Sequence, residues 1–397
     1  MTHSMFRSAA VLGLLSAVGP FTIDMYLPAM PAIGRDLSAD VGAVQMTITA
    51  YFIAFGLAQL VYGPWADQAG RRTPVFFGLT LFILASLGCT FAPTMGALVA
   101  FRFLQGLGAA VVMVVPRAII RDLYTGNEAT RLMALVMLVI SVSPMLAPLA
   151  GSGVIAVFGW RAIFAILCLA AVASLLLTRF ALPETLPPEH RVPIHFATLL
   201  SGARGLLGDR KFLGLTFTGG FGIASFFVFI ASASFVYTGQ YGLSPTGFSL
   251  AFALNAIGFF AASQLAATLG ERFGARRVVL WATAGFATMA LTTLALIAAG
   301  FTALPVLMGG LFLGNAFLGL VLPTTMVMAL DEHGDVAGLA SSLGGTLQML
   351  AGGVVTALSG VVFDGTALPM IAAIAGCAVT SFLLALSVLG RPARARA

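Results

Sequence analysis

The sequence predicts an all-α membrane protein of twelve transmembrane helices, arranged as two pseudo-symmetric bundles of six. Three observations lead to this fold class. Hydrophobic residues make up 59% of the 397 positions and charged residues only 9%, which leaves too little polar surface for a soluble protein of this size. Apolar runs of about 20 residues, the length of a helix that crosses a bilayer, recur along the whole chain. A polar segment near the middle divides these runs into six and six.

The apolar runs define the expected helices in chain order. The first six runs are 8–32, 43–65, 74–92, 97–117, 132–157 and 161–180. The second six runs are 212–237, 246–269, 277–299, 303–329, 337–363 and 367–389. Each is long enough to cross about 30 Å of hydrocarbon at 1.5 Å per residue.

The positions of Lys and Arg predict the orientation in the membrane, because positively charged loops stay in the cytoplasm. Seventeen of the 20 fall in the tails or in connections after even-numbered runs, and only two, Arg35 and Arg161, lie on the opposite side. We therefore expect both termini in the cytoplasm. The same asymmetry explains the net charge of +6, so we expect no nucleic-acid partner.

The polar segment from 181 to 211 contains four prolines and much of the charge, which is typical of a linker. We expect three parts: an N-terminal bundle over 1–180, a cytoplasmic linker over 181–211 and a C-terminal bundle over 212–397. The halves also repeat, since GPWADQAGRR (63–72) aligns with ATLGERFGAR (267–276) at an offset of 204. Repeated halves are typical of secondary transporters that alternate access to a central site.

Several other classes of protein lack their usual signals in this chain. The three cysteines are scattered singly in apolar runs, the four histidines fall in tails or loops, and no GxxxxGK[ST] phosphate loop occurs. We therefore expect no metal, no cofactor and no ATP hydrolysis. A membrane-embedded enzyme would need a catalytic cluster, and a receptor would need an output domain; neither is recognisable.

Asp24 and Arg102 are the two charged residues that lie well inside apolar runs. Such residues are costly in hydrocarbon and usually face a polar cavity, pair with each other or carry ions. Counted along the helices, Asp24 lies roughly 12 Å and Arg102 roughly 8 Å from the same membrane face. A static pair or an Arg side chain that extends to the interface is one interpretation. The other is that Asp24 alternates between protonated and ionised forms under the influence of Arg102.

Seven motifs in a fixed order resemble the major facilitator superfamily, and within it the bicyclomycin-resistance and chloramphenicol-exporter type of drug:proton antiporter. They are TIDMYLPAMP (22–31), GPWADQAGRRTPV (63–75), FRFLQGLGAA (101–110), SPMLAPLAG (143–151), GWRAIF (159–164), LPETLPP (182–188) and AGLASSLGGTLQML (337–350). The resemblance covers nearly the whole chain. It implies the major facilitator fold, export by alternating access and a location in the inner membrane of a bacterial cell.

The resemblance also implies a conformational latch in the loop after the second run. Its residues are Gly63, Asp67, Gly70, Arg71, Arg72 and Asp122. Physically, the glycines permit a tight turn, and the arginines can bind lipid phosphate or an acid such as Asp122. A loop that is basic only for topological reasons is the simpler alternative.

The fifth run carries the motif that the family associates with antiport, at Pro144, Pro148 and Gly151. Prolines free backbone carbonyls, and small residues let helices approach closely. A kinked and closely packed helix is the alternative interpretation. The family usually has glycine before the first proline, whereas Ser143 stands there in this chain.

A semi-polar helical stripe and scattered polar or aromatic residues are candidates for a roomy amphiphilic pocket. They are Tyr26, Gln45, Thr49, Gln59, Phe235, Asn255 and Gln348. Helix packing is the alternative for most of them.

The sequence thus predicts a proton-coupled efflux transporter of drugs or antibiotics. We expect it to act as a monomer, with small amphiphilic substrates, protons and membrane lipid as its partners. The alternative is an exporter or importer of a small metabolite, such as a sugar or amino acid derivative.

Overall fold

The computed structural model describes residues 3–191, 196–331, 333 and 336–390. The C-terminal arginines Arg391, Arg394 and Arg396, and residues 192–195 of the predicted linker, lie outside these ranges. Within them every regular element is a helix, and twelve helices are long and apolar enough to cross a membrane. The predicted fold class is confirmed, with boundaries that differ from the apolar runs by six residues or fewer.

The chain divides into two compact units. Unit 1 comprises residues 1–195 and 244–250, and unit 2 comprises residues 196–243 and 251–397. The predicted domain limits at 180 and 211 stay predictions.

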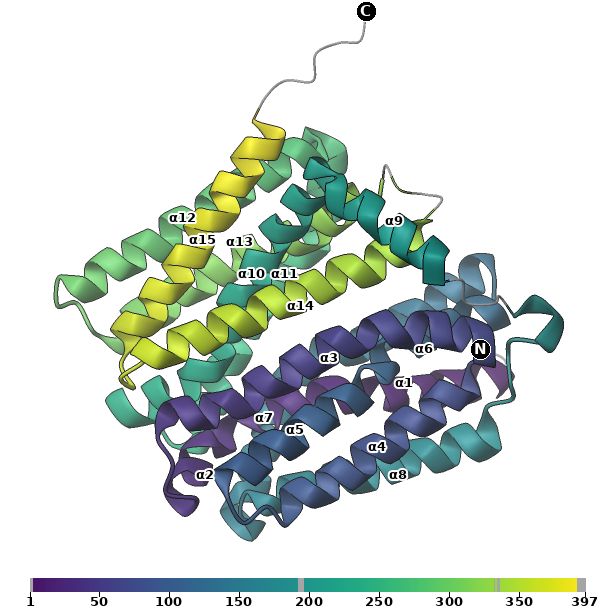
Figure 1. Cartoon of the computed structure of the whole chain (residues 1–397). Coiled ribbons are helices and arrows are strands. Elements are labelled where there is room, and N and C mark those ends of the chain that lie inside the picture. Colours follow the sequence, from purple (N-terminus) through teal and green to yellow (C-terminus); the bar gives the residue numbers. More distant parts are fainter. Residues whose placement is uncertain (1–2, 192–195, 332, 334–335, 391–397) are drawn as a thin grey trace, which may run out of the picture. The chain divides into compact units, whose positions relative to one another are not determined.

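Unit 1 contains eight α-helices. They are α1 (His3–Asp24), α2 (Met30–Asp36), α3 (Val41–Ala69), α4 (Arg72–Thr90), α5 (Met95–Ala109), α6 (Val111–Leu123), α7 (Gly126–Phe158) and α8 (Arg161–Ala181). In Figure 1, α3, α5, α4 and α8 follow one another side by side, and α1 packs against α7 and α8. Two membrane spans of this unit are interrupted helices, namely α1 followed by α2, and α5 followed by α6.

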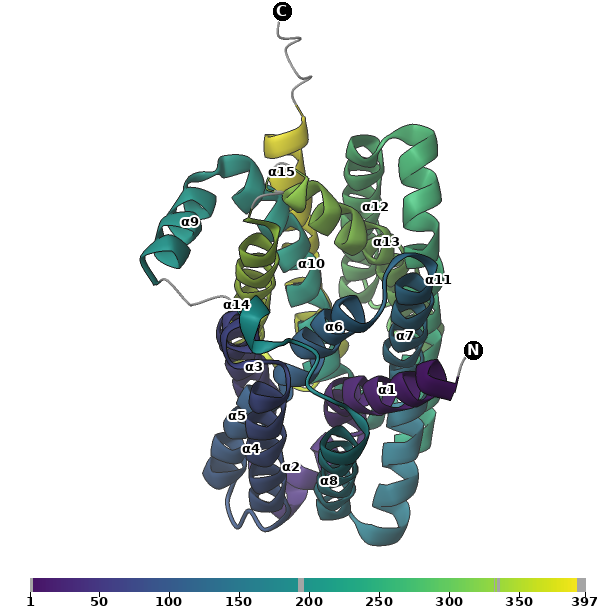
Figure 2. The ribbon, with the colours of Figure 1, turned by 90° about the vertical axis from the view of Figure 1, so that its right-hand side faces the viewer.

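Unit 2 begins with a short helix and continues with six spans. Its helices are α9 (Phe196–Gly208), α10 (Arg210–Phe235), α11 (Pro245–Phe273), α12 (Ala275–Ala298), α13 (Leu304–Leu330), α14 (Ala337–Val362) and α15 (Ala367–Leu389). The start of α11, up to residue 250, belongs to unit 1. Figure 2 shows α9 as a separate short helix beside the end of α10. Helix α10 packs against α13, α14 and α15, and it is the most buried span of the unit.

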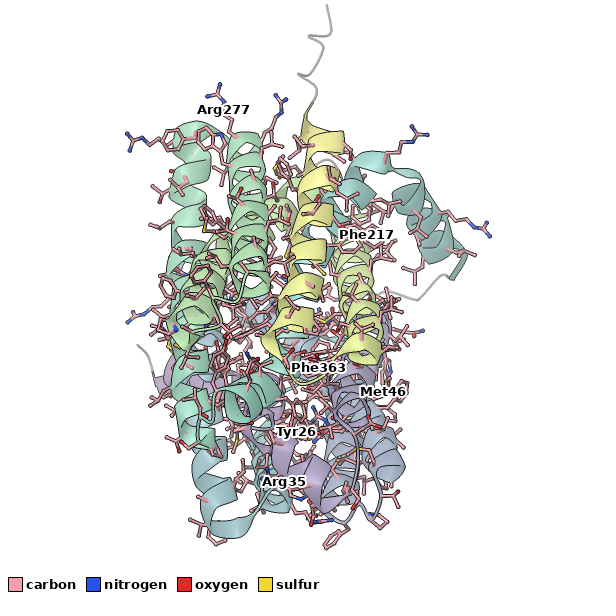
Figure 3. All side chains as sticks on the ribbon, turned by 90° about the vertical axis from the view of Figure 1, so that its left-hand side faces the viewer. Tyr26, Arg35, Met46, Phe217, Arg277 and Phe363 are labelled. Carbon is pink, nitrogen blue, oxygen red and sulfur yellow. The ribbon has the colours of Figure 1, made fainter. Side chains whose placement is uncertain are left out.

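The surface of the helices is apolar, which inverts the pattern of a soluble protein. Leu84, Phe91, Val157, Phe180 and Val361 all expose well over half of their area. Because lipid tails are as apolar as these side chains, such a surface is stable only in a bilayer. The interior carries polar groups instead; Figure 3 shows Tyr26 among the packed side chains of unit 1 and Arg35 nearer the end of that unit. The chain is a multi-pass membrane protein.

Candidate functional site

The first membrane span is interrupted directly after Asp24. Pro28 has no N–H group to donate to the Asp24 carbonyl four residues earlier, so α1 ends there and a short 3₁₀ turn, Leu27–Ala29, follows. Asp24 is 5% exposed. Among the described residues, no hydrogen bond or ion pair reaches its carboxylate. A carboxylate buried at a helix break without a partner is costly whenever it is ionised.

Arg102 is completely buried in α5 and is surrounded by aromatic rings. Its guanidinium carbon lies 4.5 Å from the ring centre of Tyr51, 4.7 Å from that of Tyr26 and 5.9 Å from that of Phe164. The aromatic faces carry negative partial charge and stabilise the cation where no carboxylate does so. We call Tyr26, Tyr51 and Phe164 the aromatic cage.

Hydrogen bonds fix one corner of the guanidinium. Its Nη1 donates to Gln105 Oε1 at 2.6 Å and to the Thr22 carbonyl at 3.4 Å. Gln105 in turn donates through Nε2 to Ser86 Oγ at 2.8 Å, and all of these side chains are buried. The Nε and Nη2 groups of Arg102 have no hydrogen-bond partner within the described part of the chain.

Asp24 and Arg102 do not form an ion pair in this structure, although the sequence places them at compatible depths. The guanidinium is held inside the cage by Gln105 and Thr22, and no ion pair of the described residues joins it to Asp24. The structure therefore does not contain the static pair that was one of the two interpretations. Whether the two residues couple transport to protons stays a prediction.

Two glycines bring the helices around this site close together. A Cβ atom at Gly106 of α5 would clash with the backbone of Tyr51, and one at Gly151 of α7 would clash with the backbone of Met25. Gly151 thus packs against the helix break that follows Asp24. Pro144 and Pro148 lie within α7, which runs unbroken from Gly126 to Phe158.

A second cluster forms at the turn between α3 and α4. Gly70 adopts a φ of +90°, a left-handed conformation that favours glycine, and the chain reverses there. Buried Arg71 follows it, and its guanidinium binds Asp122 in a bidentate arrangement, with Nε–Oδ2 at 2.7 Å and Nη2–Oδ1 at 3.2 Å. Its Nη1 also pairs with Asp67, four residues earlier. Burial acts to lower the pKa of Arg71, but the hydrogen bonds and charges of Asp122 and Asp67 raise it overall.

Glu184 completes this cluster from the segment after α8. Its carboxylate accepts the backbone N–H groups of Arg71 at 2.8 Å and Arg72 at 3.1 Å, and also those of Thr185 and Leu186. The Thr185 hydroxyl donates to Asp122 at 3.0 Å. The sequence interpretation missed these two residues as parts of the cluster. Their signal was the LPETLPP motif, which the sequence analysis used for the family resemblance without assigning a contact to Glu184 or Thr185.

Two of the predicted latch residues have different surroundings from those expected. Gly63 lies inside α3, well before its end, and a Cβ there would meet nothing within 4 Å, so it does not form the turn. Arg72 does not contact Asp122; its Nη2 donates to the Arg179 carbonyl at 3.0 Å and its guanidinium lies 5.2 Å from the Phe76 ring centre. Arg72 therefore joins α4 to the end of α8.

The repeat predicted from the sequence is visible at the corresponding turn of unit 2. Gly274 adopts a φ of +85°, as Gly70 does in unit 1. Arg276, at the position of Arg72, donates through Nε to the Leu389 carbonyl at 2.6 Å, near the end of the last helix. The position of Arg71, however, is taken by Ala275. The turn is repeated, whereas the charge cluster is not.

The pocket candidates are distributed over both units. In unit 1, Tyr26 belongs to the aromatic cage, Gln45 and Thr49 are buried in α3, and Gln59 is half-buried. In unit 2, Phe235 contacts Phe363, the Asn255 side chain donates to the Ala251 carbonyl, and Gln348 donates to the Thr216 carbonyl. Tyr26 packs against a fixed cation, so its position favours a structural contact. Substrate contact at the other residues stays a prediction.

No group of three or more His, Cys, Asp or Glu side chains that could hold a metal ion occurs among the described residues. The chemistry available to unit 1 is therefore that of one buried carboxyl, one buried guanidinium, tyrosine hydroxyls and a latch of ion pairs. Such groups can bind a proton or a polar ligand and can stabilise one conformation over another.

Comparison with known proteins identifies the family of this chain. The profile of the Major Facilitator Superfamily matches residues 12–244. An uncharacterized transporter of that type from Bacillus subtilis, YdgK, is 37% identical over 91% of this chain and 90% of its own length. A bicyclomycin resistance protein homolog from Haemophilus influenzae is 30% identical over 96% of this chain and 95% of its own length.

A solved structure extends the likeness to the fold. The D-xylose-proton symporter superimposes with a TM-score of 0.76 over 96% of this chain and 97% of its own, at 16% identity, which concerns the fold alone. The resemblance first indicated by the sequence motifs is confirmed. By sequence and by architecture, the chain belongs to the major facilitator superfamily.

Proposed function

We propose that this protein exports small amphiphilic compounds, antibiotics among them, across the bacterial inner membrane in exchange for protons. The single observation that carries the proton coupling is Asp24, a carboxyl that is 5% exposed and has no partner among the described residues. The name of the Haemophilus influenzae relative supports a drug as the substrate. We place both termini in the cytoplasm, and we propose a monomer that carries out no catalysis.

Proton coupling follows from the cost of burying charge. An ionised carboxylate at the Asp24 position has no hydrogen bond or ion pair from the described residues, whereas a protonated one is neutral and can donate a hydrogen bond. A conformational change that alters its access to water or to Arg102 would therefore bind or release a proton. The positive charge of Arg102 in the aromatic cage favours the ionised form of the Asp24 carboxyl.

The Arg71 cluster is the proposed latch. Asp67, Arg71, Asp122 and Glu184 form a network within unit 1 that depends on the exact positions of the α3–α4 turn and the segment after α8. Contacts of this kind stabilise the one conformation in which they all form. We propose that transport requires them to weaken and re-form once in each cycle.

Transport of a metabolite such as a sugar or an amino acid derivative is the alternative on the same fold. The likeness to the D-xylose-proton symporter concerns the fold only, and the names of the relatives favour drug efflux. No structural feature of the described residues favours this alternative.

The test uses an efflux-deficient bacterial host that produces the protein. Cells should tolerate higher concentrations of bicyclomycin or chloramphenicol and should accumulate less of the compound, and a proton uncoupler should abolish the difference. Cells that produce Asp24→Asn at an equal level should resemble cells without the protein. Unchanged susceptibility to a broad drug panel, combined with proton-dependent uptake of a sugar or amino acid, would establish the alternative.

A further inference from the structure

Tyr51 of α3 has an unusual hydroxyl group. The residue is completely buried, its ring packs against Phe52 and Phe55, and its face lies against the Arg102 guanidinium. Its hydroxyl has no hydrogen-bond partner among the described residues. Buried hydroxyls in native proteins are almost always hydrogen-bonded, to protein or to water, so an exception calls for an explanation.

The other tyrosine of the aromatic cage shows the ordinary arrangement. The Tyr26 hydroxyl lies 2.6 Å from Thr47 Oγ1, which itself donates to the Val44 carbonyl. Two tyrosines therefore hold the same cation with their rings, but only one has a satisfied hydroxyl. The ring contact with Arg102 does not account for the Tyr51 hydroxyl, since phenylalanine would make that contact equally well.

The surroundings of the Tyr51 hydroxyl indicate which groups it can bind. The Tyr51 ring lies on the Arg102 guanidinium, which also contacts the Thr22 carbonyl and the Tyr26 ring, so the segment that contains Asp24 passes the same cation. The charges of Arg102 and Asp24 both act on the hydroxyl. Arg102 offers three unused N–H groups, one on Nε and two on Nη2, which are donors only. Ionised Asp24 is an acceptor only. A tyrosine hydroxyl can accept a hydrogen bond from the first group and donate one to the second, so its chemistry suits both.

Buried water is the natural partner of such a group of unsatisfied atoms. A polar site with several donors and acceptors holds ordered water, whereas an apolar void stays dry. The unpartnered Arg102 Nε, Arg102 Nη2 and Tyr51 hydroxyl are polar groups of the kind that bind a buried water molecule, which typically makes two to four hydrogen bonds. The other titratable groups that face this site are Tyr26, from the turn after α1, and Cys89, from α4.

We propose that the Tyr51 hydroxyl, with water bound against Arg102, is the positioning group that links the Asp24 carboxyl to the Arg102 guanidinium. When Asp24 releases its proton to solvent, Tyr51 donates a hydrogen bond toward the carboxylate and accepts one from the Arg102 side. Tyr51 itself stays protonated throughout. This inference rests on the proposed role of Asp24, and it explains how a cation held away from Asp24 can still stabilise its ionised form.

The test compares two substitutions in the same helix. Tyr51→Phe removes one hydroxyl and keeps the ring over Arg102. Tyr62→Phe removes the hydroxyl of another buried tyrosine of α3, which stacks on Trp65, outside the cage. Equal elution profiles and melting temperatures of the purified variants would show that both are folded. Tyr26→Phe adds a third comparison, because it breaks a satisfied hydrogen bond inside the cage.

The readout needs no substrate. Infrared difference spectra recorded over a pH series follow the carboxyl band that is lost in Asp24→Asn. A hydrogen bond to an ionised group is worth enough to move a titration midpoint by about one pH unit. We expect the midpoint of this band to rise by about that amount in Tyr51→Phe and to stay at the wild-type value in Tyr62→Phe. An unchanged midpoint in Tyr51→Phe, or an equal rise in both variants, would overturn the proposal.

A second measurement separates this proposal from the proposed function. Each compound of the drug panel, chloramphenicol included, is added to the wild-type protein and to Tyr51→Phe at each pH, and the released protons are measured. If the wild type releases none although the infrared midpoint still depends on Tyr51, proton-coupled drug export is wrong and the link between Tyr51 and Asp24 stands. If the wild type releases protons and Tyr51→Phe does so at the same pH as wild type, the link is wrong and the proposed function stands.

Discussion

Arg71 binds Asp122 through two nitrogens, and this pair joins the turn between α3 and α4 to the end of α6. Bidentate pairs of this kind are stronger and more directional than single contacts because both partners are planar. Glu184 holds the backbone of the same turn, so three segments far apart in the sequence meet at one arginine. The network can thus respond to a movement of any of the three.

Asp67 offers a direct test of the latch. Its side chain is 55% exposed and pairs with Arg71, so Asp67→Asn should leave folding intact and shift the balance of conformations. We expect a several-fold lower rate of drug export at an unchanged amount of protein in the membrane. The control is Glu271→Gln, which makes the matching change in the repeated segment of unit 2. A wild-type rate from Asp67→Asn would reduce this loop to a turn that only determines topology.

Glu184 should matter for stability as well as for transport. Glu184→Ala would leave four backbone N–H groups without their acceptor, and unsatisfied groups of this kind cost about 1–3 kcal/mol in total when water replaces the acceptor in part. The apparent melting temperature of the purified protein should fall by several degrees. Glu189→Ala, five residues later at an exposed position, is the matched control and should have no effect. Equal melting curves for the two variants would contradict the assigned role.

Gly151 and Gly153 form a matched pair on α7. A Cβ at Gly151 would strike the backbone of Met25 beside the Asp24 break, whereas one at Gly153 meets nothing within 4 Å. Gly151→Ala should therefore separate α7 from α1 and impair export severely. Gly153→Ala should be tolerated, since alanine is about 1 kcal/mol better than glycine within a helix. Drug susceptibility and protein yield measure both effects, and equal behaviour of the two variants would speak against close packing at Gly151.

Asp24 and Arg102 remain the central test of coupling. Asp24→Asn should abolish substrate-induced proton release, because an amide cannot exchange a proton with solvent in this pH range. Arg102→Ala should release protons only at higher pH, since the cation that favours ionised Asp24 is lost. Arg102→Lys keeps the charge but cannot reproduce the planar contacts with the cage and Gln105, and should restore release in part. Undiminished release from Asp24→Asn would point to another carboxylate.

The stability of the start of α10 should depend on pH. Asp209 caps this helix and accepts N–H groups of Lys211 and Phe212, and it pairs with His333 at 3.0 Å. Burial raises the pKa of Asp209, but these contacts outweigh it and lower the pKa overall. A lowered folded-state pKa stabilises the protein above the ordinary pKa of aspartate, and this stabilisation is lost as the pH falls through the folded-state value.

Asp209→Asn should accordingly lower the melting temperature at pH 7. The difference in melting temperature between this variant and the wild type should become smaller as the pH approaches 3. Asn can still cap the helix, so this variant removes only the negative charge, and because Asp209 is partly exposed to solvent we expect an effect of about 0.3–1 kcal/mol. Glu189→Gln serves as a control without such contacts. A constant difference between Asp209→Asn and wild type across this pH range would show that ionisation of Asp209 is not involved.

The sequence predicted the helices well because apolar length alone determines a membrane span. It also found Asp24, Arg102 and Arg71, since a charge is conspicuous in an apolar run or a basic turn. It could not show that Arg102 is held by rings and by Gln105, because aromatic residues are abundant in every span. Nor could it show that Glu184 binds the turn at Gly70, since that contact depends on how α8 returns to α4. Contacts between distant segments depend on packing, which composition and spacing do not determine.

The repeated turn at Gly70 and Gly274 carries the buried arginine, Arg71, in only one copy, and this has a consequence for chimeric proteins. A tandem fusion of two first halves would contain two Arg71 clusters, and a fusion of two second halves would contain none. The first fusion should be the more rigid and the second the more labile, even though both would have the same backbone turns. At the offset of 204, Ala275 takes the place of Arg71 and Met326 that of Asp122, so the two halves share a backbone turn but differ in the ion pair that fastens it.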